Sequence, residues 1–152
     1  MYSEMLGNKY FLARNYENAA VNFQHSLQKD PINKSMRKKL IICYTQIGQI
    51  QKAFESFYQL VKEDINFIIE TDLVADDCPC VELTDKYGNV LPYENESFDL
   101  KLMLGMLWLY CNAEKSFEFF KRIIVENPGD SRIKEIASLI EGKIKPTNKP
   151  IH

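Results

Sequence analysis

The chain has 152 residues, of which 45% are hydrophobic, 12% aromatic and 26% charged, and its formal net charge is −2 at neutral pH. This composition is that of an ordinary globular domain, and it excludes collagen-like, fully disordered and disulfide-scaffold proteins. A nearly balanced total charge gives no general attraction to nucleic acid or to an anionic membrane, so neither is expected as a partner.

The apolar residues of the sequence predict neither a secretion signal nor a membrane-spanning helix. The N-terminal residues show no basic stretch followed by an apolar run, and the longest apolar run, Leu102 to Leu109, is interrupted by Gly105. That run is far shorter than the roughly 20 residues of a membrane-spanning helix. We therefore expect a cytoplasmic protein, whose four cysteines (Cys43, Cys78, Cys80 and Cys111) are reduced thiols.

The first two segments of the chain repeat each other at an offset of 34 residues. Four pairs of identical residues coincide at this offset: Leu6 with Leu40, Tyr10 with Tyr44, Ala19 with Ala53, and Phe23 with Phe57. Because residues four apart share one face of a helix, each repeat is predicted to be a pair of helices. A small Ala beside a large Phe lets the two helices approach closely, with the ring over the space that Ala leaves. A short turn separates the helices, and Pro31 ends the first repeat.

A third, less regular repeat is predicted at residues 98–129. It contains Leu104, Gly105 and Trp108 in its first half and Ser116, Phe120 and Pro128 in its second half. Residues 131–142 then place apolar side chains at helical spacing, which predicts a helix that caps the stack. The last residues, 143–152, contain two prolines and three lysines and are predicted to be a flexible tail.

The spacing of Leu6-Gly7, Tyr10, Ala19, Phe23 and Pro31 resembles the tetratricopeptide repeat (TPR) family, whose pattern is L-G-x2-Y, A-x3-F and P. The resemblance covers residues 1–65 and 98–142. It implies an all-α fold, namely a TPR-type α-α superhelix of about three helix pairs with a C-terminal capping helix. These form a single domain of residues 1–142, with repeats at about 1–33, 34–65 and 98–129.

Residues 66–97 interrupt the repeats and are predicted to form a small insertion. Residues 65–73 are apolar enough to extend the preceding helix, while residues 80–84 and 90–93 flank a Gly-Asn turn and predict a β-hairpin. Between residues 65 and 99 the chain carries nine acidic residues and one base, a net charge of −8 that leaves +6 for the remainder. Two interpretations stay open: a solvated loop, or an acidic face that docks a basic partner or the chain's own Lys-rich helix.

The family resemblance also implies a binding surface, because the first helix of each TPR lines a concave groove that receives a segment of a partner protein. Position by position, this groove is lined in the first two repeats by Glu4, Asn8, Phe11, Leu12, Ser35, Lys38, Ile42 and Thr45. In the third repeat the alternatives are Lys101, Leu102, Met106, Trp108 and Leu109. We predict that a partner peptide or protein segment is bound by Asn8, Phe11, Leu12, Lys38, Ile42, Thr45 and Lys101.

Asn8 matches an asparagine that holds a partner's terminal carboxylate in some TPR proteins, but the rest of that clamp is missing. Glu4 stands where a lysine is expected, and Lys39 stands where a second asparagine is expected. A basic cluster nearby consists of Lys34, Arg37, Lys38 and Lys39. It lies near a predicted helix start, where cations oppose the helix dipole. This cluster is either a solvated face or a site for an acidic partner, the chain's own insertion included.

No enzyme, cofactor or metal site is predicted, because the sequence lacks a phosphate-binding Gly loop, a metalloprotease motif and a nucleophile elbow. Two alternatives to a peptide-binding module remain. One is a metal- or thiol-dependent regulatory domain that uses Cys78-Pro79-Cys80, although the spacing of these thiols is not that of a typical zinc or redox site. The other is self-association into a homo-oligomer through apolar residues of the insertion, namely Phe67, Ile68, Leu91 and Tyr93.

Overall fold

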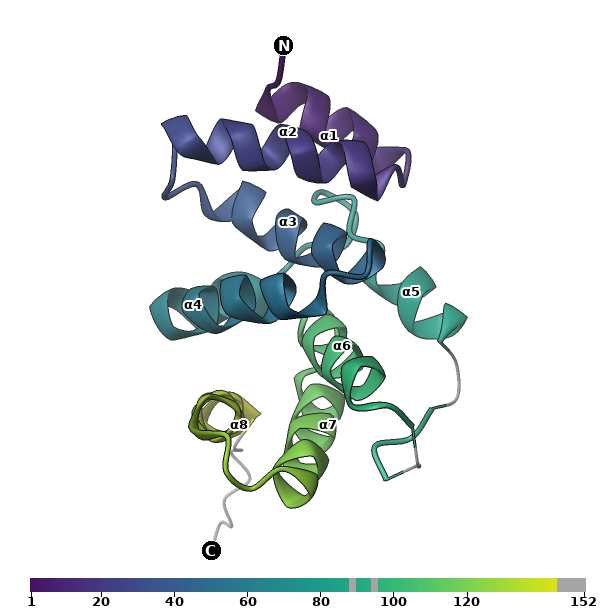
Figure 1. The fold of residues 1–152 in the computed structure, drawn as a ribbon, viewed down its shortest axis with the longest axis vertical. Helices are drawn as coiled ribbons and strands as arrows, with labels where there is room; N and C mark the ends of the chain where they lie inside the picture. Colours follow the sequence, from purple (N-terminus) through teal and green to yellow (C-terminus); the bar gives the residue numbers. More distant parts are fainter. Residues whose placement is uncertain (88–89, 94–95, 145–152) are drawn as a thin grey trace, which may run out of the picture. The chain divides into compact units, whose positions relative to one another are not determined.

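A computed structural model describes residues 1–87, 90–93 and 96–144, and within these ranges it contains eight helices and no strand (Figure 1). The helices are α1 (Glu4–Leu12), α2 (Tyr16–Lys29), α3 (Lys34–Gln46), α4 (Ile50–Ile69), α5 (Cys80–Lys86), α6 (Phe98–Leu109), α7 (Ala113–Glu126) and α8 (Ser131–Ile144). The prediction of an all-α chain is therefore confirmed.

The helices belong to two compact units. The first unit consists of Met1–Leu60 and Asp72–Cys78, and the second consists of Val61–Thr71 and the chain from Pro79 onward. The chain thus leaves the first unit after Leu60, returns to it at Asp72 and leaves it again after Cys78. Helix α4 contains the first of these passages, and its helical geometry is interrupted at Asp64 (φ −164°, ψ 76°).

In the first unit, α1 and α2 form a helical hairpin, and α3 packs on both (Figure 1). Each of the three helices begins at a polar side chain that accepts a hydrogen bond from the backbone N–H three residues later. The distances are 3.0 Å at Ser3, 3.2 Å at Asn15 and 2.9 Å at Asn33. Such caps satisfy N–H groups that lack a partner within the helix, so they fix where each helix starts.

Gly7 and Phe23 set the close contact between α1 and α2. The Phe23 ring is fully buried, and a Cβ atom added to Gly7 would lie 2.5 Å from Phe23 Cε1. The sequence predicts Ala19 as the small partner of this ring, whereas in the structure Gly7 supplies the space directly beneath it. Ala19, which the repeat pattern places opposite the ring, is buried as well.

In the second unit, α6 pairs with α7, α7 packs on α8, and α5 packs on α6. The α6–α7 contact uses the same device as the first hairpin, since a Cβ on Gly105 would lie 3.1 Å from the Phe120 ring. Ser116 stands at the small position of this hairpin, and its buried hydroxyl donates a hydrogen bond of 2.6 Å to the Gly105 carbonyl oxygen.

The predicted β-hairpin of the insertion is wrong for residues 80–84, because these residues lie in helix α5. Cys80, Leu83 and Thr84 are its buried residues, and their spacing of three and four places them on one face of a helix. The apparent alternation in the sequence therefore hid a helical periodicity. The proposed Gly-Asn turn at residues 88–89 lies outside the described residues. Residues 65–69 are helical as predicted, but the non-helical Asp64 separates them from the preceding part of α4, and residues 70–73 lie beyond its end.

The predicted C-terminal helix is confirmed by α8, whose buried side chains Ile133, Ile136, Ala137 and Ile140 follow the expected spacing. This helix continues to Ile144, so the first two residues of the predicted tail are helical. The rest of the predicted tail, residues 145–152, lies outside the described residues. Of the helices described, none combines the length and the apolar character needed to cross a membrane.

Candidate functional site

The structure buries five of the seven residues predicted to bind a partner. Their exposed fractions are 1% for Phe11, 4% for Lys38, 1% for Ile42, 4% for Thr45 and 2% for Lys101. Leu12 is 59% exposed, and Asn8 is half-buried. In this conformation the five buried side chains do not reach the surface, so the contacts they make within the chain decide what they do.

Thr45 makes a contact within its own helix, whereas Lys101 makes one that joins two helices. The Thr45 hydroxyl donates a hydrogen bond of 2.6 Å to the Ile42 carbonyl oxygen, one turn earlier in α3. Lys101 on α6 donates to both carboxylate oxygens of Glu126 on α7, at 3.0 and 2.8 Å. Arg122 also donates to Glu126, at 3.1 Å. The hydrogen bond from Lys101 is the main reason why the pKa of Glu126 is lower than usual, and Arg122 acts in the same direction.

A cluster of cations gathers between α1 and α3 in the first unit. We define the cationic cluster as the three cations Arg14, Lys38 and Lys39 together with Asn8 and Phe11, which lie beside them. Lys39 Nζ donates a hydrogen bond of 2.9 Å to Asn8 Oδ1, and it lies 5.7 Å from the centre of the Phe11 ring. The Arg14 guanidinium lies 5.9 Å from the same ring centre. Each of these two cations is attracted to the electron-rich face of the Phe11 ring, so the ring holds both of them close to α1.

The segment Asp72–Cys78, which we call the acidic turn, folds on itself between α4 and α5. Asp72 Oδ1 accepts hydrogen bonds from the backbone N–H groups of Val74 (3.1 Å) and Ala75 (3.0 Å). The Cys78 N–H donates 3.0 Å to the Leu73 carbonyl oxygen, and the Asp72 N–H donates 3.2 Å to Asp76 Oδ2. These bonds give the turn a defined shape without a regular helix.

The acidic turn is bound to the cationic cluster through two polar contacts. Lys38 Nζ donates 3.0 Å to Asp76 Oδ2, and the two side chains are 5% and 29% exposed. Arg14 Nη1 donates 2.8 Å to the Asp77 carbonyl oxygen. Of the two interpretations of the acidic insertion, docking on the chain's own Lys-rich helix is therefore confirmed for this segment. The cluster holds one side-chain carboxylate and the main-chain carbonyl of the next residue.

The contact joins two residues with unusual backbone conformations. Arg14 has φ 62° and Asp77 has φ 51°, and across the described ranges these are the two non-glycine residues with positive φ. A residue with a side chain adopts this left-handed region at a cost of roughly 1–2 kcal/mol. Aspartate tolerates it better than arginine does. The contact between Arg14 and Asp77 thus forms where the chain carries local strain.

Sequence reasoning identified Lys38 and Asn8 but missed Arg14 and the individual role of Asp76. Arg14 lies in the short turn between the helices of the first repeat, and no local signal distinguishes it from other turn residues. Asp76 is one of nine acidic residues between residues 65 and 99. The sequence signal for this contact is the opposite charge of the insertion and of the basic cluster at residues 34–39. Opposite charge indicates that the two segments attract each other, but it does not indicate which atoms meet.

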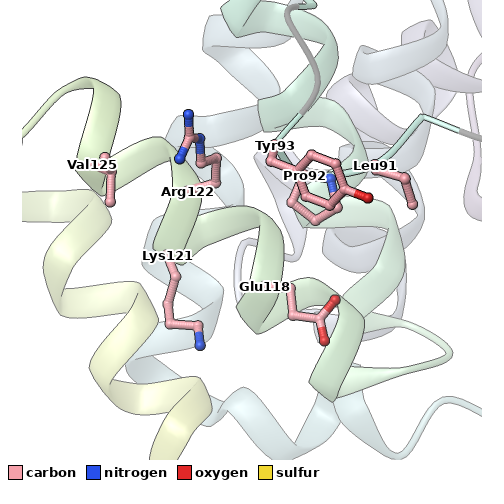
Figure 2. Close-up of a pocket in the computed structure, with 7 residues that line it drawn as sticks. All are labelled: Leu91, Pro92, Tyr93, Glu118, Lys121, Arg122 and Val125. Carbon is pink, nitrogen blue, oxygen red and sulfur yellow. The ribbon is translucent and has the colours of Figure 1, made fainter.

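A second surface feature, a pocket of about 530 Å³, lies in the second unit. Figure 2 shows Leu91, Pro92 and Tyr93 on one side and residues of α7 on the other. The α7 residues are Glu118, Lys121, Arg122 and Val125. Leu91, Tyr93 and Val125 are 41%, 66% and 66% exposed. Exposure of Leu91 and Tyr93 agrees with the self-association hypothesis, whereas Ile68, which that hypothesis also used, is fully buried.

The cysteines are largely shielded. Cys43 and Cys80 are buried, and Cys78 is half-buried. Burial raises the pKa of Cys43 to about 12, so its thiol stays protonated at neutral pH. Within the described part of the chain, no three or more His, Cys, Asp and Glu side chains are grouped closely enough to hold a metal ion.

Comparison with known proteins identified no matching family model, no matching curated protein and no matching solved structure. The functional argument therefore rests on the residues and contacts of this chain.

Proposed function

We propose that the chain is a non-catalytic protein-interaction module of the TPR type, which binds a peptide or protein segment of a partner on the face formed by α1 and α3. One observation carries this proposal. The cationic cluster between these helices already holds a non-helical segment of chain, the acidic turn, through a side-chain ion pair and a main-chain carbonyl contact.

The helical hairpins support the TPR type. In both α1–α2 and α6–α7, a glycine of the first helix meets a phenylalanine ring of the second, at Gly7–Phe23 and Gly105–Phe120. These residues occupy the Gly and Phe positions of the repeat pattern. Tertiary contacts at the same positions in two hairpins are what a repeated structural unit would produce.

The chemistry of the α1/α3 face suits a peptide better than a small substrate. Arg14 contacts a main-chain carbonyl group, which every peptide offers, while Lys38 contacts a carboxylate, which only some residues offer. The first contact supplies affinity for extended chain, and the second supplies selectivity through a charge-assisted hydrogen bond. Leu12, which is exposed on α1, provides apolar surface at the end of this face.

Site-specific cross-linking tests this proposal. A photo-reactive amino acid placed at exposed Leu12 should capture a partner from an extract of the native host, and mass spectrometry should map the contact. The matched control carries the same group at Leu139, which is 36% exposed on α8. A partner that cross-links equally from both positions, or from neither, would contradict the assignment of the α1/α3 face.

Self-association is a second candidate, favoured by the exposed side chains around the pocket of Figure 2. Leu91, Tyr93 and Val125 would bury their apolar surface against a second copy. Sedimentation at several protein concentrations should then show a dimer that Val125→Glu disrupts. A monomer at all concentrations would exclude this candidate.

A further inference from the structure

We infer that the cationic cluster is a recognition site for an acidic peptide segment of a partner, and that the acidic turn occupies this site in the unbound chain. The inference rests on the proposed function and goes beyond it in two respects. It assigns the chemistry of the partner segment, and it assigns to Asp72–Cys78 the role of an internal competitor.

The two contacts of the acidic turn define what the site recognises. Lys38 binds the side-chain carboxylate of Asp76, and Arg14 binds the main-chain carbonyl oxygen of Asp77. These acceptors belong to consecutive residues, so the site selects an acidic residue followed by a residue whose carbonyl group is free. A partner segment with this arrangement reproduces both charge-assisted hydrogen bonds.

The acidic turn is held in a way that allows it to be exchanged. None of its seven residues, 72–78, is buried, and Val74 is 85% exposed. Its release therefore moves none of the turn's own apolar side chains out of a fully buried position, a move that costs free energy in proportion to the apolar area exposed. The left-handed backbone of Asp77 also raises the free energy of the acidic turn in its docked state, which further favours release of the turn.

A comparison with Lys101, another buried lysine, shows the difference. Lys101 binds both carboxylate oxygens of Glu126, and each residue lies in a helix that packs against the other. Lys38 binds Asp76, which lies in a turn and not in a helix. The Lys101 pair can separate only if α6 and α7 separate, whereas the Lys38 pair can separate while every helix stays folded.

Lys38 also explains why the replacement must be anionic. Its side chain is 5% exposed, and a cation held at this depth is stabilised by a nearby negative charge. When the acidic turn leaves, a carboxylate from the partner restores this charge. A neutral segment would supply the carbonyl contact to Arg14 but not the contact to Lys38.

The test uses the full chain and a synthetic fluorescein-labelled peptide with the sequence of residues 70–79, in which the cysteine is replaced by serine. In the Asp76→Ala chain the internal carboxylate is gone and Lys38 is retained, so fluorescence polarisation should show binding at least about tenfold tighter than to the unaltered chain. Asp85→Ala serves as the control, because it removes one acidic residue of the insertion outside the turn and should leave binding unchanged.

Three further arms make the result specific. A peptide in which the aspartate corresponding to Asp76 is replaced by asparagine should lose binding to the Asp76→Ala chain. Adding Lys38→Met to that chain should abolish binding of the acidic peptide. The exchanged pair, Lys38→Asp with Asp76→Lys, should reform the internal contact, so residues 70–79 should exchange amide hydrogens as slowly as in the unaltered chain. If Asp76→Ala does not fold, judged by circular dichroism, Asp76→Asn replaces it.

Either of two results would overturn the inference. The first is no binding of the acidic peptide to a folded Asp76→Ala or Asp76→Asn chain, and the second is equal binding to the altered and unaltered chains. The outcome is separable from that of the cross-linking experiment. A partner captured from Leu12 together with no acidic-peptide binding would refute this inference alone, whereas failure of the capture would refute the proposed function.

Discussion

The absence of one methyl group sets the distance between α1 and α2. Gly7 lies in a helix, where alanine is ordinarily preferred by about 1 kcal/mol. At this position, however, the Phe23 ring fills the space that a Cβ atom would need, with ring carbons 2.5 and 2.7 Å away. The Phe23 ring is itself buried on its other side and in contact with Phe11, at a centroid distance of 6.3 Å, so it has little freedom to move aside.

Gly7→Ala should therefore destabilise the first unit by about 1–3 kcal/mol, because the added methyl group overpacks the hairpin. Hydrogen exchange of α1 and α2 amides measures this local stability. Gly142→Ala in α8 is the matched control, since nothing lies within 4 Å of the added Cβ, and it should be neutral or stabilising by up to about 1 kcal/mol. If both substitutions stabilise the chain, Gly7 is not a packing requirement.

At the scale of the element, the α6–α7 pair depends on an ion pair whose two partners are unequal. Lys101 is 2% exposed, while the Glu126 side chain is 31% exposed and is also bound by Arg122. Removal of the carboxylate leaves a cation buried without its partner. Removal of the lysine leaves a carboxylate that water and Arg122 still stabilise.

Glu126→Ala should thus destabilise the second unit by about 1–3 kcal/mol, as expected when a buried donor loses its hydrogen-bond acceptor. Lys101→Met, which fills the same space without a charge, should cost distinctly less. Trp108 is the single tryptophan and lies in α6, so its fluorescence follows urea unfolding of this unit. Equal losses in the two variants would show that burial of Lys101 carries no electrostatic cost.

The same pair predicts a pH dependence. The pKa of Glu126 in the folded chain is lower than its ordinary value of 4.5, chiefly because of the hydrogen bond from Lys101. The unfolded chain therefore binds this proton more readily. The stabilisation is fully present above about pH 4.5 and is lost as the pH falls through the lower folded value. Glu126→Gln should lack this contribution, so its stability difference from the unaltered chain should shrink on acidification, measured by urea unfolding with Trp108 fluorescence.

The elements also show which parts of the fold can be predicted from the sequence. Helix pairs could be predicted because their signals are local, namely the recurring Leu, Tyr, Ala and Phe positions of the first two repeats. Helix α5 was mispredicted because a seven-residue segment contains too few buried positions to separate a period of 2 from a period of 3.6. The contact of Lys38 with Asp76 spans 38 positions in the sequence. No local pattern encodes such a separation, so charge patterning indicated attraction but could not select Asp76.

At the scale of the whole molecule, the course of the chain is the informative feature. It leaves the first unit after Leu60, returns as the acidic turn, and leaves again after Cys78. The acidic turn is therefore the part of the insertion that belongs to the first unit. It contacts Lys38 and Arg14 of this unit, and none of its own side chains is fully buried.

Loss of those contacts should release the turn without unfolding the helices. We expect Asp76→Ala to accelerate hydrogen exchange in a peptide covering residues 70–79 while α2 and α7 keep their protection. Mass spectrometry of quenched, digested samples provides the measurement, with Asp85→Ala as the charge-matched comparison. Unchanged exchange in residues 70–79 would mean that other contacts hold the turn in place.

The acidic turn is covalently attached on both sides, ten residues separating the end of α4 at Ile69 from the start of α5 at Cys80. A short tether of this kind gives a bound segment an effective concentration on the order of 1 mM. A partner segment of equal intrinsic affinity, present at about 1 μM, would be outcompeted roughly a thousandfold, which corresponds to about 4 kcal/mol. A natural partner must therefore supply that much additional binding free energy from contacts outside the two hydrogen bonds. The tether thus acts as an affinity threshold, which rejects acidic chain segments that offer nothing more than their charge.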